Sequence, residues 1–195
     1  MYWTDTGPLE DIRRANLDGT GEQVLVTGQN SPTGLALDTT NGKMYWVNQF
    51  GHTLWSANQD GTGQQVLLTG LTEPTNIALD LVSGKIYIAD WLGTIDRVNL
   101  DGTGLETLVT GQTGAEGIAL DIADDKMYWA TALQGSIQRA NLDGTGLETV
   151  VTGLSFPVGI ALQIETTSVP EPSALILFGI STLGLIGYTR RRKSV

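Results

Sequence analysis

Short apolar runs separated by turn-forming residues follow one another along residues 1–163. The runs are rich in Val, Ile, Leu, Tyr and Trp, and Gly, Asn and Asp cluster between them. Asp-Gly, which stands at 18–19, 60–61, 101–102 and 143–144, favours tight hairpins because both central residues tolerate positive φ. No segment here has the apolar spacing of an amphipathic helix of three or more turns. The pattern predicts an all-β domain of many short antiparallel strands.

The apolar runs belong to one repeated unit. Each copy begins at a tyrosine, and the four tyrosines, Tyr2, Tyr45, Tyr87 and Tyr128, are spaced 43, 42 and 41 residues apart. An Asp-Gly-Thr-Gly turn follows in each copy, then a Val/Leu-rich run, and then an Ala-Leu segment at 34–38, 76–80, 117–121 or 159–163. Four strands in a repeat of this length predict one blade of a β-propeller.

The repeats resemble YWTD repeats, also called LDL-receptor class B repeats, over residues 1–163. The resemblance implies a propeller with the Ala-Leu segment as innermost strand and the tyrosine-led run as second. Four blades' worth of strands is present, whereas the family norm is six. The motif aspartate, present at Asp5 and Asp90, is replaced by Asn48 and Thr131. Because the family uses these positions to hydrogen-bond neighbouring blades, we expect the second and fourth blades to be less tightly tied.

Two readings account for the blade count. Strand 159–163 would close a ring by pairing beside strand 2–5, which leaves no sheet edge exposed. Alternatively, Met1 is an internal codon of a longer reading frame that encodes a signal peptide and about two further blades. Met1 stands where the other repeats carry the core residues Met44, Ile86 and Met127, and no signal-peptide pattern opens the sequence. We therefore expect the propeller domain, residues 1–165, to be N-terminally truncated.

A different pattern follows the repeats. We predict a linker at 166–173, a transmembrane helix at 174–189 and a basic cytoplasmic tail at 190–195. The uncharged stretch at 173–189 would span roughly 25 Å as a helix, just short of the roughly 30 Å hydrocarbon core. A basic end favours the cytoplasmic side, which places the propeller outside the cytoplasm.

The C-terminal segment resembles the PEP-CTERM sorting signal of bacteria. The residues that carry the resemblance are Pro170, Glu171 and Pro172 before the apolar stretch, and Arg190, Arg191, Arg192 and Lys193 after it. It implies an exosortase, a membrane protease, as partner and processing near the Pro-Glu-Pro element. We expect an inner-membrane anchor first, and a cell-surface or extracellular location after processing.

Charge and composition exclude several functions. The net charge is −10, and four of the eleven basic residues lie in the terminal tail, so the acidic repeats repel nucleic acid. With no cysteine and one histidine, a zinc site is excluded. The Asp-Gly-Thr-Gly segments offer one carboxylate each, which favours hairpin turns over Ca²⁺ loops. We expect no catalytic residue, no metal and no cofactor.

Binding residues are expected where the copies differ. In a propeller, the loops after the second strand and before the first strand share one face, and loops on a rigid scaffold collect binding residues. The candidates are Phe50, His52, Trp91, Leu92, Leu133, Gln134 and Phe156, together with Glu73 and Glu116. The repeated Tyr and Trp residues instead suit packing between blades rather than sugar stacking.

We therefore predict a non-enzymatic scaffold at the surface or in the matrix that binds an extracellular protein or polysaccharide. Two alternatives stay open. One is a propeller hydrolase of the lactonase kind, which requires metal ligands such as Asp38 to converge on the central channel. The other is a non-functional gene fragment that does not fold alone.

Overall fold

Residues Met1–Leu162 form one compact unit of the chain. The structure, a computed structural model, describes residues 1–163. In that part of the chain there is no helix that is long and apolar enough to cross a membrane. The predicted transmembrane helix at 174–189, the Pro-Glu-Pro element and the basic tail lie outside the described residues.

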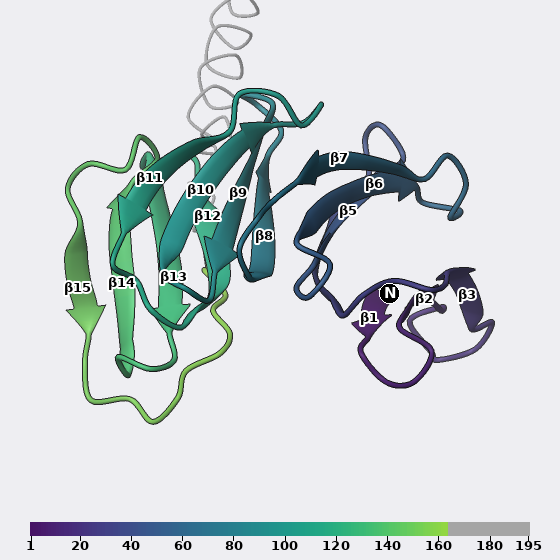
Figure 1. Cartoon of the computed structure of the whole chain (residues 1–195), viewed down its shortest axis with the longest axis horizontal. Helices are drawn as coiled ribbons and strands as arrows, with labels where there is room; N and C mark the ends of the chain where they lie inside the picture. The colour runs from purple at the N-terminus through teal and green to yellow at the C-terminus, as the bar shows by residue number, and fades with distance from the viewer. Residues whose placement is uncertain (164–195) are drawn as a thin grey trace, which may run out of the picture. The chain divides into compact units, whose positions relative to one another are not determined.

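The described unit consists of four antiparallel sheets that follow one another in chain order (Figure 1). Sheet A holds β1 (Tyr2–Asp5), β2 (Asp11–Arg14) and β3 (Gln23–Val26). Sheet B holds β4 (Pro32–Asp38), β5 (Lys43–Asn48), β6 (Thr53–Asn58) and β7 (Gln65–Thr69). Sheet C holds β8 (Pro74–Asp80), β9 (Lys85–Asp90), β10 (Thr94–Asn99) and β11 (Glu106–Thr110). Sheet D holds β12 (Ala115–Asp121), β13 (Lys126–Thr131), β14 (Ser136–Asn141) and β15 (Glu148–Val151).

The Asp-Gly-Thr-Gly segments form the hairpins predicted for them. In sheet C, Gly102 has a φ of 85°, a left-handed conformation that favours glycine. One oxygen of Asp101 accepts hydrogen bonds from the backbone N–H and the hydroxyl of Thr103, at 2.9 and 2.6 Å. The same pair of bonds recurs in the turns of the other three sheets. The aspartate therefore holds the turn together.

Neighbouring sheets pack through alternate residues of the second strand. In β5, Met44 and Trp46 belong to the apolar core shared with sheet A, whereas Tyr45 and Val47 belong to the core shared with sheet C. Sheet D continues the pattern, since Met127 and Trp129 of β13 pack against sheet C. The period of two along a strand thus gives each sheet two apolar faces, one for each neighbour. The expected packing role of the repeated Tyr and Trp is confirmed at these positions.

The first strands of sheets B, C and D, which are β4, β8 and β12, lie close together (Figure 1). A Cβ built on Gly34 of β4 would lie 2.4 Å from the Cα of Asn76 in β8. Thr33 donates a hydrogen bond to the carbonyl of Pro74 in β8, at 3.3 Å, and Thr75 donates to the carbonyl of Ala115 in β12, at 2.8 Å. A small residue at position 34 is required because the two backbones approach so closely.

The expectation that strand 159–163 closes a ring beside strand 2–5 needs correction. Sheet A has three strands in the order β1-β2-β3, and residues 159–163 form no strand. Instead of pairing beside residues 2–5, the segment lies along β12, where the N–H of Gly117 donates to the carbonyl of Val158 at 2.9 Å. The segment thus occupies the place of a further first strand, and within residues 1–163 no second strand pairs with it.

Candidate binding face

The connectors that lead from one sheet to the next are fixed by side chains of the second strand. In sheet C the buried carboxylate of Asp90 accepts hydrogen bonds from the backbone N–H groups of Thr72 and Glu73, at 3.2 and 2.8 Å. Its other oxygen accepts the N–H of Leu92 at 2.9 Å. Asp90 therefore holds the loop before β8 and the loop after β9 in one place.

Sheets B and D hold their connectors by a different contact, which the sequence analysis missed. The side-chain oxygen of Gln29 accepts hydrogen bonds from Trp46 Nε1 and Asn48 Nδ2, both at 3.0 Å, in a buried site. In sheet D, Gln112 accepts the indole N–H of Trp129 at 3.2 Å. These glutamines are additional ties at the connectors, and the expectation that the second and fourth blades are less tightly tied stays a prediction. The sequence contains a sign of this contact, because a Gln in the connector occurs together with a Trp in the second strand in both sheets.

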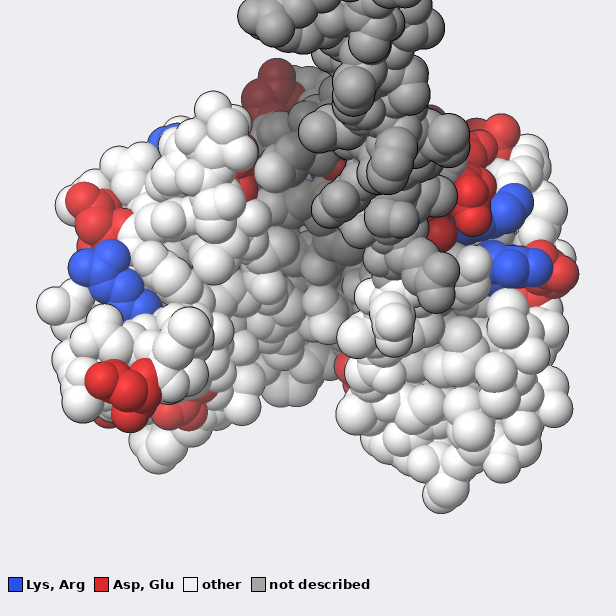
Figure 2. Space-filling view, turned by 180° about the vertical axis from the view of Figure 1, so that it is seen from behind, with Lys and Arg blue, Asp and Glu red and all other residues white. Residues whose placement is uncertain are grey.

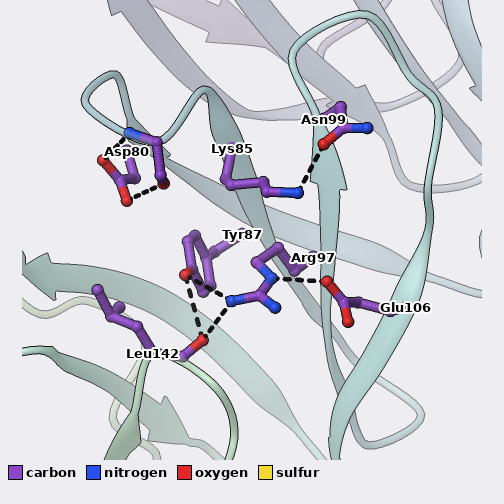
Figure 3. A network of polar contacts seen from close by, with 8 residues as sticks. Asp80, Lys85, Tyr87, Arg97, Asn99, Glu106 and Leu142 are labelled. Carbon is purple, nitrogen blue, oxygen red and sulfur yellow. Dashed lines mark hydrogen bonds and ion pairs between the residues drawn. The ribbon is translucent and has the colours of Figure 1, made fainter.

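A second link joins neighbouring sheets at the opposite end of the tyrosine-bearing strands (Figure 3). Tyr87 Oη and Arg97 Nη1 of sheet C both donate to the carbonyl of Leu142 in sheet D, at 3.2 and 2.9 Å. Arg97 lies over the Tyr87 ring, 5.8 Å from its centroid, and also pairs with Glu106. Burial raises the pKa of Tyr87, so its hydroxyl remains a donor.

The same link joins sheets A and B. Tyr2 and Arg14 donate to the carbonyl of Gln59, at 3.3 and 3.1 Å. Ser56 occupies the arginine position in sheet B, where it pairs with Tyr45 across the strands. We call the tyrosine, the arginine and the carbonyl they share the Tyr–Arg clasp.

A polar cavity of about 530 Å³ lies where the first strands begin. Sheets A, B, C and D all contribute to its wall, which is lined by Thr4, Thr6, Ser31, Thr33, Gly34, Leu35, Gln49, Thr75, Asn76 and Glu116. Among the lining residues of the described part of the chain Glu116 is the one that ionises, and burial raises the pKa of this carboxyl. Hydroxyl and amide groups dominate the rest. Glu116 was predicted as a candidate from the sequence, whereas the threonines were not, although Thr33 and Thr75 each follow a proline in the repeat.

The residues predicted for the binding face lie on loops at this same end of the sheets. Four of them are largely exposed apolar side chains, with Phe50 60%, Leu92 57%, Leu133 57% and Phe156 55% accessible. The rings of Trp91 and Phe156 are tilted by 52° with centroids 6.2 Å apart. The structure thus brings Trp91 and Phe156 together across the sequence.

The two polar candidates are held by the loops. His52 contacts the carbonyl of Thr72 through Nδ1, and Gln134 donates to the carbonyl of Gly111 at 3.0 Å. Ser31, His52 and Phe156 have φ of 56°, 56° and 54°, a conformation that is uncommon for residues other than glycine. Backbone of this kind persists where surrounding contacts fix it, and it is often found at functional sites.

The inner-strand aspartates serve turns at the opposite end of the sheets. Asp38 accepts hydrogen bonds from the backbone and side chain of Asn41, at 3.0 and 2.7 Å, and these bonds lower its pKa. Asp80 similarly accepts the N–H groups of Val82 and Ser83, and Asp121 that of Asp124. Within residues 1–163 no group of three or more His, Cys, Asp or Glu could hold a metal ion.

Comparison with solved structures agrees with this architecture and with the recurring motif. A crystal structure of a nidogen/laminin complex matches with a TM-score of 0.75 and 28% sequence identity, over 81% of this chain and 62% of that one. The chain has the YWTD, or LDL-receptor class B, propeller-like fold. The YWTD repeats also match low-density lipoprotein receptor-related protein 5-like protein of Homo sapiens, with 50% identity over 46 residues, 23% of this chain and 18% of that protein.

A protein of unknown function from Bacteroides thetaiotaomicron VPI-5482 shares the fold at a TM-score of 0.57 and 15% identity, over 71% of this chain and 38% of that one. The chain spans less than two thirds of the length of each of these relatives. Residues 168–193 match the PEP-CTERM protein-sorting motif. This motif implies an exported, surface-sorted protein that an exosortase processes.

Proposed function

We propose that this YWTD protein is a non-enzymatic binding scaffold, displayed at the cell surface or in the extracellular matrix, whose loop face binds another protein. The observation that carries the proposal is the recurrence of an exposed apolar side chain in equivalent loops of three sheets. Phe50, Leu92 and Leu133 come from equivalent loops of sheets B, C and D, and each is more than half exposed. Apolar anchors beside polar groups are typical of protein-binding surfaces.

Three observations support a protein ligand over a polysaccharide. The exposed side chains are largely aliphatic or tilted aromatic, whereas Trp46 and Trp129 are buried and cannot stack on sugars. Charged residues form small separate groups, rather than one extended patch, on the part of the surface that Figure 2 shows. The related nidogen fold was crystallised in a complex with laminin.

A capture experiment that offers both kinds of ligand tests whether the loop face binds a protein or a polysaccharide. The full chain, held in detergent micelles, is used to capture surface proteins and exopolysaccharide from the organism's own envelope fraction. We expect a protein to be retained, and we expect Leu92→Ser with Leu133→Ser to abolish its retention. Val82→Ser is the matched control, because Val82 is 87% exposed in the turn after β8, at the other end of the sheet. Retention of polysaccharide alone, or equal loss with Val82→Ser, contradicts the proposal.

The lactonase-like alternative has a direct test as well. We expect no metal-dependent hydrolysis from the chain. Because Asp38 accepts the hydrogen bonds of the Asn41 turn, Asp38→Ala should lower only the stability of the fold. A hydrolytic activity that depends on metal and disappears in Asp38→Ala would favour the enzyme. A cooperative thermal transition of the chain excludes the non-functional fragment.

Anchoring and release are proposed to depend on the Pro-Glu-Pro element. Proline fixes its own φ and disfavours the helical conformation of the residue before it, so this element is a suitable recognition sequence for a protease. We expect Pro170→Ala with Pro172→Ala to leave the chain unprocessed in cells that contain an exosortase, measured by the shift in mass on immunoblots. Normal processing of this variant would show that cleavage does not require the element.

A further inference from the structure

We propose that the polar cavity receives a primary ammonium group, that of a lysine side chain on the bound protein, and that Glu116 is the residue that pairs with it. The inference rests on the proposed function, because it names the group of the protein ligand that enters the cavity. The cavity of about 530 Å³ lies within the range of roughly 300–1,000 Å³ that is typical of ligand sites.

Glu116 departs from a contact that the other sheets repeat. It occupies the position that Thr33 holds in β4 and Thr75 holds in β8, the second residue of the first strand. Thr33 donates to the carbonyl of Pro74 in the next sheet, and Thr75 donates to that of Ala115. An ionised carboxyl has no hydrogen to donate, so sheet D gives up this contact. Such a departure from the pattern of a fold is expected at a functional site.

The carboxyl of Glu116 is half-buried and has no cationic partner within residues 1–163. Every basic side chain of these residues is bonded to another group, as holds for Arg13, Arg14, Lys43, Lys85, Arg97, Lys126 and Arg139. Burial raises the pKa of the Glu116 carboxyl because the charged form is poorly solvated there. A cation that enters the cavity would offset this cost.

The cavity wall offers oxygen acceptors and no charged donor. Thr33 and Thr75 each have one hydroxyl hydrogen, which points at backbone carbonyls, so the lone pairs of both oxygens remain for a guest. Among the described residues that line the cavity there is no lysine or arginine. Three neighbouring first strands thus each present an acceptor. An ammonium group suits this wall, because it carries three N–H donors on a single atom.

The surroundings of the cavity favour a lysine side chain over an amino sugar. Leu35 lies in the cavity wall, and the exposed Phe50 directly follows Gln49, another residue of that wall. A lysine has an apolar stem and a charged head, so it fits a polar site that is bordered by apolar side chains. The net charge of −10 also attracts a basic ligand.

Binding of a lysine model compound tests the site directly. Nα-acetyl-lysine N-methylamide is titrated into the full chain in detergent micelles and followed by ligand-observed NMR. We expect saturable binding, and we expect the norleucine analogue, which lacks the amine, to bind at least about tenfold more weakly. Glu116→Gln keeps the shape of the side chain but removes its charge, and should weaken binding of the lysine compound about tenfold. Preference for glucosamine over the lysine compound would assign the cavity to a polysaccharide and overturn the proposal.

Glu73→Gln is the matched control. Glu73 carries the same charge in the connector before β8 but does not line the cavity. We expect this variant to bind the lysine compound as the unchanged chain does. Equal weakening in both variants would show only an effect of net charge, and full binding by Glu116→Gln would show that the carboxylate is not used. Either result contradicts the role of Glu116.

A second substitution separates a binding role from a structural one. Glu116→Thr copies Thr33 and Thr75, and its hydroxyl can donate to the carbonyl of Pro157, the counterpart of Pro74. We expect a higher melting temperature together with the loss of lysine binding, because a group kept for a ligand is not the most stable choice for the fold. A lower melting temperature would show that Glu116 serves the fold instead.

Capture of the protein ligand distinguishes this inference from the proposed function. N-acetylation of the envelope proteins removes the charge of their lysines, and we expect it to abolish retention, as Glu116→Gln does. Retention that needs Leu92 and Leu133 but tolerates both changes would refute the lysine contact and leave the loop-face function standing. A chain that retains no protein but binds the lysine compound through Glu116 would overturn the proposed function and leave the ammonium site in place.

Discussion

Two sets of side chains hold equivalent connectors in neighbouring sheets. In sheet C the ionised acceptor of Asp90 binds backbone N–H groups, while in sheets B and D the neutral acceptors Gln29 and Gln112 bind indole N–H groups. In sheet B the substitution is incomplete, because the buried oxygen of Asn48 has no hydrogen-bond partner among residues 1–163. Replacing the motif aspartate therefore leaves one buried polar atom unsatisfied, which carries an energetic cost.

The Gln29 contact should be a large contributor to stability. Gln29→Leu would leave Trp46 Nε1 and Asn48 Nδ2 buried without their acceptor, and we expect a loss of about 1–3 kcal/mol in the free energy of unfolding. Urea denaturation followed by tryptophan fluorescence measures it. Gln65→Leu, at an exposed position of β7, is the control and should change stability by less than about 0.5 kcal/mol. Equal effects of the two variants would rule out the assigned role.

The hairpin aspartates should titrate abnormally. The Thr103 hydroxyl, followed by its backbone N–H, lowers the pKa of Asp101. Because the folded pKa is the lower one, the stabilisation is present above about pH 4 and disappears as the pH falls through the folded pKa. Thr103→Val should raise the pKa of Asp101, seen by NMR titration, while Asp60 in the same protein stays lowered by its own Thr62. An unchanged Asp101 titration would show that the hydroxyl is unimportant.

At the scale of strands, close backbone approach determines which glycines are essential. Gly34→Ala would place a methyl group 2.4 Å from the Asn76 backbone, so β4 and β8 must separate, and we expect a loss of about 1–3 kcal/mol. Gly159 occupies the same position in the last repeat and has no atom within 4 Å of a built Cβ. Gly159→Ala should therefore be nearly neutral. Thermal melts of the two variants compare them, and similar losses would contradict the inner-strand contact.

Strands and turns could be predicted from the sequence because their causes are local. Alternating apolar residues and the Asp-Gly pairs lie within one repeat, and the structure has strands and hairpins at those places. The shifts in strand register could not be predicted. Sheet A has one between β2 and β3, and sheets B, C and D each have two, one between the first and second strands and one between the third and fourth, as at Pro32/Leu35 and Leu54/Trp55. A bulge changes the register of two paired strands by one residue, and the apolar pattern of the sequence is compatible with a strand with or without it.

Contacts between repeats were harder to predict. The Tyr–Arg clasp depends on a carbonyl that lies 45 residues away in the chain, which no motif within a repeat can indicate. The binding face was predicted from differences between the loops, and the structure places those loops at one end of the sheets. The cavity-lining threonines were missed because their positions are similar from repeat to repeat.

At the scale of the described unit, the main contacts between sheets join neighbours in the chain order, A with B, B with C and C with D. In such a series of sheets, the terminal sheets unfold locally more readily than the central ones. We expect the amides of sheets B and C to exchange with deuterium most slowly, and those of the three-stranded sheet A most rapidly. Hydrogen exchange read by mass spectrometry gives the order, and uniform protection across the four sheets would contradict it.

Equivalent positions of each repeat make the contacts between neighbouring sheets. This has a consequence for how the length of the gene can change. Consecutive tyrosines are 43, 42 and 41 residues apart, and each intervening segment encodes a complete set of contacts for one neighbour on either side. Recombination between two copies of the repeat therefore deletes or duplicates a whole sheet and rejoins matching surfaces. The natural step in the evolution of this chain is a gain or loss of about 42 codons, and the reading frame survives each step.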